Sequence, residues 1–163
     1  MNYTTAREMI ETGDLIAVKK RRGIFSILTY TITKSPYTHT ATAIWIENGL
    51  WIAEINLSGN RLVPLSQISD PFDVYDCPVK DRENVRASIL QRLRIHQKYG
   101  VGDLFLIALK ELFGVSTNTT KYDICSEYCM NIYKDAGWIT TLPKIPSPKD
   151  LVKILGNIKI EVD

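Results

Sequence analysis

The sequence lacks the features that mark secreted, membrane-spanning or disulfide-stabilised proteins. It has only three cysteines in 163 residues, and an odd number does not suggest a disulfide framework. No apolar run approaches the ~18 residues that a membrane-spanning helix needs, so we expect no membrane span. The first residues contain no apolar stretch of the kind found in secretory signals. We therefore expect a cytoplasmic protein, with export by another route left open.

A strong charge of either sign is missing as well. The chain has 20 Lys and Arg residues and 18 Asp and Glu residues, which gives a formal net charge of +2. This excess is too small to favour a nucleic acid as a partner. Hydrophobic residues make up 45% of the chain and charged residues 23%, which is ordinary for a globular protein. The length fits one domain, so we expect residues 1–163 to form a single unit.

Local patterns predict an α+β protein with a small antiparallel sheet and mostly C-terminal helices. Asn48-Gly49 is the strongest short hairpin signal and predicts that the segments on either side pair as antiparallel strands. The segment 24–33 is apolar and rich in β-branched residues, so helix and strand both remain open there. The expected strands cover 15–18, 39–46, 50–55, 61–65, 72–77 and 158–162. The expected helices cover 5–12, 82–98, 104–113, 124–136 and a short segment that starts at 147.

Cys125 is the candidate nucleophile. With Asp123 as the expected N-cap, Cys125 falls in the first helical turn, where free backbone N–H groups and the positive helix end favour a thiolate. A helix end contributes about 0.3–1 kcal/mol, which is less than one pKa unit, so the thiol also needs a cationic partner. A histidine is the residue that can supply it. The backbone N–H of Cys125 is also a candidate donor to an oxyanion.

The chain offers two histidines as that partner. His39 opens the best-defined strand, and a strand end is a rigid mount for a catalytic side chain. His96 lies late in an amphipathic helix among charged residues, which is a solvated setting. A zinc site made from both histidines with Cys125 and Cys129 lacks the usual paired spacing of zinc ligands. We therefore favour His39 as the base and expect neither a metal nor another cofactor.

Glu54 is the candidate group that orients the imidazole. With Asn48-Gly49 as a two-residue turn, Glu54 pairs opposite Ala43 and lies on the same face of the sheet as His39. The two side chains are then offset by four residues, which is roughly 13 Å and longer than a hydrogen bond. A wider turn, a bulge or strong twist would have to close that gap. An orienting group from another strand therefore stays open.

Four segments of the sequence carry a resemblance to a known family. In chain order they are Gly13-Asp14-Leu15-Ile16, Tyr37-Thr38-His39-Thr40-Ala41, Ala53-Glu54 and Cys125-Ser126-Glu127-Tyr128. Their order and spacing over about residues 10–140 resemble the permuted papain-like amidases of the NlpC/P60 superfamily, of the YaeF/YiiX type. The resemblance implies a circularly permuted papain-like fold. It also implies that Cys125 is the nucleophile, His39 the base and Glu54 the orienting acid.

The same resemblance implies a thiol-dependent hydrolase that cleaves an amide bond through an acyl-enzyme. The leading substrate is a peptide or a peptidoglycan-type amide. Relatives that move acyl groups on lipids leave a lipid acyltransferase or thioesterase as an alternative. An inactive binding module that keeps the papain-like cleft is a third hypothesis. The expected helices between 81 and 121 match no family pattern, so the resemblance does not define the substrate.

Overall fold

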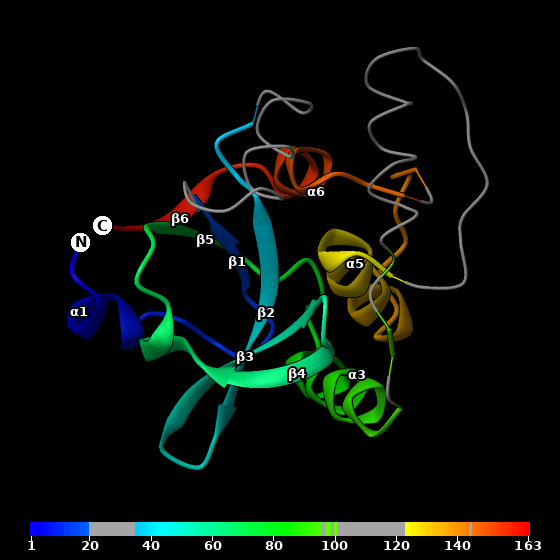
Figure 1. The fold of residues 1–163 in the computed structure, drawn as a ribbon, viewed down its shortest axis with the longest axis horizontal. Helices are drawn as coiled ribbons and strands as arrows, with labels where there is room; N and C mark the ends of the chain where they lie inside the picture. The colour runs from blue at the N-terminus through cyan, green and yellow to red at the C-terminus, as the bar shows by residue number, and fades with distance from the viewer. Residues whose placement is uncertain (20–34, 96, 99, 101–122, 144) are drawn as a thin grey trace.

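The described residues form an α+β fold around a six-stranded antiparallel sheet in the order β4-β3-β2-β1-β5-β6 (Figure 1). The structure is a computed structural model that describes residues 1–19, 35–95, 97, 98, 100, 123–143 and 145–163. Its strands are β1 (Leu15–Val18), β2 (His39–Ile46), β3 (Gly49–Asn56), β4 (Gly59–Pro64), β5 (Phe72–Tyr75) and β6 (Ile158–Val162). Its helices are α1 (Tyr3–Arg7), α3 (Arg82–Arg94), α5 (Cys125–Asp135) and α6 (Pro148–Leu155), with a 3-10 turn at Leu65–Gln67. The expected fold class is confirmed.

Alternating side chains give the sheet two apolar faces. On one face, Ala17 and Ile44 pack with buried residues of α3, α5 and α6. On the other face, Ile16 and Ala43 pack with Ala6 of α1 and its neighbours. Helix α5 lies against β2 and β3 (Figure 1). It therefore covers the two strands that carry His39 and Glu54.

The β2–β3 hairpin differs from the expected one in its register. The turn is Glu47-Asn48 rather than Asn48-Gly49, and Gly49 pairs with Ile46 as the first residue of β3. Glu47 takes the left-handed backbone conformation, with φ at 51°. A side chain at position 49 would lie 2.6 Å from the indole nitrogen of Trp51, so the glycine is needed for close packing. The observed turn moves the register by two residues from the expected one and places this glycine beside the indole.

Three helix boundaries also differ from the prediction. The first helix is Tyr3–Arg7 instead of 5–12, because Asn2 caps it by accepting a hydrogen bond from the Thr5 N–H at 3.0 Å. Helix α3 begins after Asp81, as expected, but ends at Arg94 rather than 98. Helix α5 begins at Cys125, with Ile124 rather than Asp123 at the N-cap. The ambiguous segment 24–33, the expected helix 104–113 and His96 lie outside the described residues.

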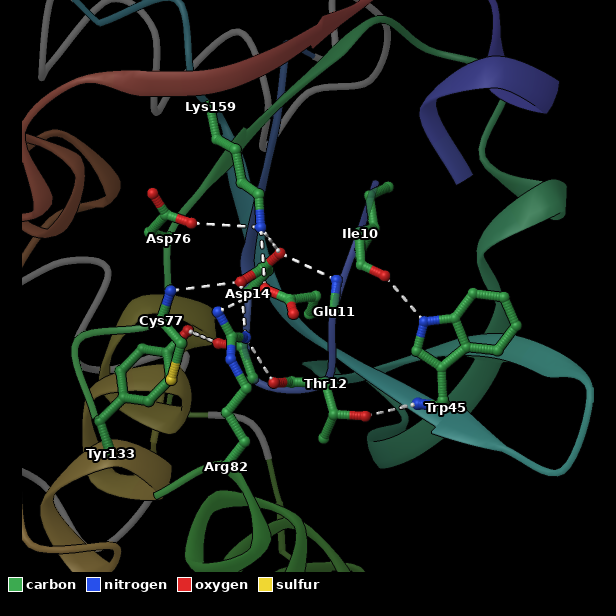
Figure 2. Close-up of polar contacts among 11 residues, drawn as sticks. Ile10, Glu11, Thr12, Asp14, Trp45, Asp76, Cys77, Arg82, Tyr133 and Lys159 are labelled. Atoms are coloured by element: carbon green, nitrogen blue, oxygen red, sulfur yellow. Dashed lines mark hydrogen bonds and ion pairs between the residues drawn. The ribbon is translucent and has the colours of Figure 1, made fainter. Parts of the chain in front are cut away.

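A buried carboxylate fixes the start of β1 (Figure 2). Asp14 is fully buried and pairs with Arg82 at 2.8 Å and with Lys159 at 2.9 Å. Lys159 also pairs with Glu11 and Asp76, each at 3.2 Å, so one ammonium links three carboxylates. Because a buried carboxylate is costly unless it is paired, these contacts tie α3 and β6 to the first strand.

No described helix combines the length and the apolar character that crossing a bilayer requires.

Candidate active site

Cys125 is the first residue of α5. The helix begins there because the Tyr128 N–H donates to the Ile124 carbonyl at 2.8 Å, while the Glu127 carboxylate accepts from the Ile124 N–H at 3.2 Å. The backbone N–H groups of a first helical turn have no partner within the helix. Cys125 therefore holds its sulfur and its own N–H at the positive end of α5, as the sequence predicted. It is 3% exposed.

His39 is the first residue of β2 and pairs with Val18 of β1. Its imidazole lies close enough to the Cys125 thiol for each group to shift the pKa of the other. Its Nε2 atom lies 2.6 Å from Oε2 of Glu54. The side chain is 21% exposed, so the imidazole is more open to solvent than the cysteine that it contacts.

Glu54 reaches His39 because of the shifted hairpin register. The ladder pairs Thr42 with Ala53, and one step further it sets Glu54 opposite Ala41. Ala41 and His39 are two residues apart, so Glu54 and His39 are diagonal neighbours on one face of the sheet. Diagonal neighbours are about 7–8 Å apart at the backbone, within reach of these side chains. The expected offset of four residues between Glu54 and His39 was wrong because the observed register differs from the expected one by two residues.

Arg61 of β4 completes the arrangement, and the sequence reasoning missed it. It lies directly opposite Glu54 in the β3–β4 ladder. Its Nε and Nη2 atoms approach Oε1 of Glu54 at 2.8 and 2.7 Å. One carboxylate oxygen thus faces His39 and the other faces Arg61. A cross-strand pair of opposite charges is the signal that could have revealed it.

The protonation states follow from these contacts. Burial by itself would lower the pKa of His39, but its contacts with Cys125 and Glu54 outweigh burial and raise the pKa to about 10. Burial would raise the pKa of Glu54, but His39 and then Arg61 lower it to about 2. Burial would also raise the pKa of Cys125, but His39, with a smaller contribution from Thr40, brings it below its ordinary value. The arrangement favours a thiolate, an imidazolium and a carboxylate.

The other two cysteines behave differently. Burial raises the pKa of Cys129, one helical turn after Cys125, to about 12. Burial also raises the pKa of Cys77. All three cysteines are unbonded, as expected for the 125–129 pair. Cys125 is therefore the one cysteine whose surroundings favour the thiolate.

The fold is similar to that of a solved structure described as metalloprotein YiiX (DUF1105) from Escherichia coli O157:H7. The two share 15% sequence identity over 94% of this chain and 96% of that chain, with a TM-score of 0.55. This likeness concerns the fold alone, and it confirms a YiiX-type α+β fold. No family model matches the sequence. No curated protein matches it either. Membership of the NlpC/P60 superfamily stays a prediction.

Proposed function

We propose that the protein is a cysteine hydrolase that cleaves an amide bond through an acyl-enzyme, with Cys125, His39 and Glu54 as its catalytic residues. The observation that carries this proposal is that His39, which is hydrogen-bonded to Glu54, lies beside Cys125 and lowers the pKa of its thiol. A nucleophile beside a base that is oriented by a third group is the arrangement that cysteine and serine hydrolases use. Ordinary core cysteines have no such partner.

The chemistry follows from the protonation states. The Cys125 thiolate attacks the amide carbonyl carbon, and the carbonyl oxygen takes up the negative charge beside the backbone N–H of Cys125. The His39 imidazolium then donates its proton to the leaving amine as the carbon–nitrogen bond breaks. Water attacks the resulting thioester, its proton passes to His39, and the acid product leaves the sulfur. Glu54 keeps the imidazole oriented through both steps and stabilises its charged form before it donates the proton and after it accepts one from water.

The same thioester serves two reactions, so the acyl acceptor decides between them. Water gives a peptide or peptidoglycan-type hydrolase, which is our leading proposal. An alcohol or amine in place of water gives an acyltransferase. The low exposure of Cys125 favours a different alternative, a binding module that keeps the fold without turnover.

The description of YiiX as a metalloprotein raises the question of a metal in this chain. Within the described ranges, no group of three or more His, Cys, Asp or Glu side chains is arranged to hold a metal ion. The imidazole of His39 is engaged by Cys125 and Glu54, and Glu54 also binds Arg61. These residues do not fit a metal centre, and the mechanism above contains no metal step.

Labelling with a panel of peptide and acyl electrophiles, read out by intact-protein mass spectrometry, tests the proposal. We expect a single adduct on the wild-type chain, no adduct on Cys125→Ala, and an unchanged adduct on the matched control Cys129→Ala. Preference for acyl electrophiles over peptide electrophiles would favour the acyltransferase. A wild-type chain that forms no adduct, or a Cys125→Ala chain that keeps it, would remove the proposal.

A further inference from the structure

Thr40, the residue after His39, turns its side chain toward α5. Along β2, Thr40, Thr42 and Ile44 share one face, and Ile44 packs in the same apolar cluster as Cys125 and Cys129. Both threonines are 0% exposed. Two buried hydroxyl groups of β2 therefore face the helix that carries the two thiols.

Neither hydroxyl makes a well-formed hydrogen bond among the described residues. This is unusual, because buried polar groups are nearly always paired. A hydroxyl carries one proton to donate, and a neutral thiol is a weak acceptor for it. A thiolate is a much stronger acceptor, because hydrogen bonds to ionised groups are the strong ones. An unpaired buried hydroxyl on this face is therefore available to donate to a sulfur that carries negative charge.

Thr40 acts on the sulfurs of both Cys125 and Cys129, whereas Thr42 acts on that of Cys129. Burial raises the pKa of Cys125 and His39 lowers it, and the N–H and hydroxyl of Thr40 lower it further. The pKa of Cys129 is raised by burial to about 12, and Thr42 is the first of the contacts that oppose this rise. At neutral pH Cys129 stays a thiol, so the hydroxyl of Thr42 has no anion to stabilise.

We propose that Thr40 stabilises the thiolate of Cys125 by donating its hydroxyl hydrogen bond to the sulfur. This inference rests on the proposed role of Cys125 as the nucleophile. His39 takes the thiol proton on one side, and Thr40 solvates the charge left on the sulfur from another side. Thr40 then replaces the water that burial keeps from the sulfur. The hydrogen bond weakens when the sulfur becomes a neutral thioester.

The alkylation rate of Cys125 by iodoacetamide, measured against pH on the full chain with the modified cysteine identified by peptide mass spectrometry, tests this role. Thr40→Val removes the hydroxyl and keeps the branched shape. We expect its rate at mildly acidic pH to fall about tenfold, the size of losing one charge-assisted hydrogen bond. At alkaline pH, where the thiol is ionised anyway, the rate should match or exceed that of the wild type, since a less acidic thiol gives a stronger nucleophile.

Thr42→Val is the matched control, because it removes an equally buried hydroxyl from the same face of the same strand. Its pH profile should coincide with the wild-type profile, and Thr40→Ser should restore that profile. If Thr40→Val does not fold, the Thr40→Ser and Thr40→Ala pair gives the same comparison. A Thr40→Val profile that superimposes on the wild type overturns the inference.

A different result would contradict the proposed function. That function fails if wild-type Cys125 reacts no faster at mildly acidic pH than Cys77 does. A fast wild-type Cys125 together with an unaffected Thr40→Val chain would leave the function standing and remove only the role of Thr40.

Discussion

Glu54 lies diagonally across the β2–β3 ladder from His39, and its Oε2 atom is 2.6 Å from the Nε2 atom of the imidazole. This contact exists because the hairpin turns at Glu47-Asn48. With the turn at Asn48-Gly49, Glu54 would lie two residues further along β2. The position of one turn therefore decides whether the chain has an oriented imidazole.

Replacing Glu54 by glutamine tests that contact. Glu54→Gln keeps the shape of the side chain but removes the charge that raises the pKa of His39, so less thiolate forms at neutral pH. We expect kcat/KM for an amide substrate to fall on the order of 10²–10⁴-fold. Glu47→Gln, at the exposed turn of the same hairpin, is the matched control and should behave as the wild type. A Glu54→Gln chain with kcat/KM within threefold of the wild type would show that Glu54 has no part in turnover.

The sequence predicted the strand and the helix start that carry the proposed base and nucleophile, but not the contacts that hold these two residues in place. Strand alternation and helix signals correctly placed His39 on a strand and Cys125 at a helix start. The predicted turn was wrong because Glu47 takes the left-handed conformation, so the chain reverses at Glu47-Asn48 and Gly49 already begins β3. The N-cap was wrong too, and Asp123 instead has a partner distant in sequence, Arg92 at 3.4 Å. Local patterns cannot reveal contacts between segments that meet only in the fold.

Arg61 should matter less than Glu54. Its side chain is 52% exposed, and exposed ion pairs contribute only about 0.2–1 kcal/mol. Arg61→Met frees Oε1 of Glu54 while His39 keeps Oε2, so the carboxylate stays near the imidazole with a raised pKa. We expect kcat/KM to fall less than about tenfold, with Arg61→Lys in between. Steady-state kinetics of the three chains decide this. A loss as large as that of Glu54→Gln would mean that Arg61 acts on the substrate itself.

The stability of the chain should depend on pH through the same residues. The pKa of Glu54 is lowered to about 2, so its contribution is complete above its ordinary pKa of 4.5 and is lost as pH falls toward 2. The pKa of His39 is raised to about 10, so its contribution is complete below its ordinary pKa of 6.5 and is lost as pH rises through 10. Each group changes the free energy of unfolding by at most about 1.4 kcal/mol per pH unit.

Urea titrations from pH 2 to 10 on the wild type and Glu54→Gln measure this dependence. The stability advantage of the wild type should be greatest between pH 4.5 and 6.5 and shrink on both sides. Activity should decline as pH approaches 10, where the imidazolium loses its proton. An advantage that does not vary with pH would show that the two side chains do not form a charged pair.

Lys159 should stabilise the fold without affecting the chemistry. Its ammonium links Asp14, Glu11 and Asp76, and Asp14 is fully buried (Figure 2). Removing one partner of a buried pair can cost about 3–5 kcal/mol, but Arg82 still neutralises Asp14. We therefore expect Lys159→Met to lower the free energy of unfolding by about 1–3 kcal/mol.

The exposed residue Lys153 of α6 provides the matched control, and Lys153→Met should change the urea midpoint little. The cluster around Asp14 lies at one end of β1. Val18, which pairs with His39, lies at the other end. The alkylation profile of Cys125 in folded Lys159→Met should therefore coincide with that of the wild type. If stability is unchanged, the cluster does not hold β6 to the sheet. If the profile shifts while the chain stays folded, the charge of Lys159 acts on the thiol across the length of β1.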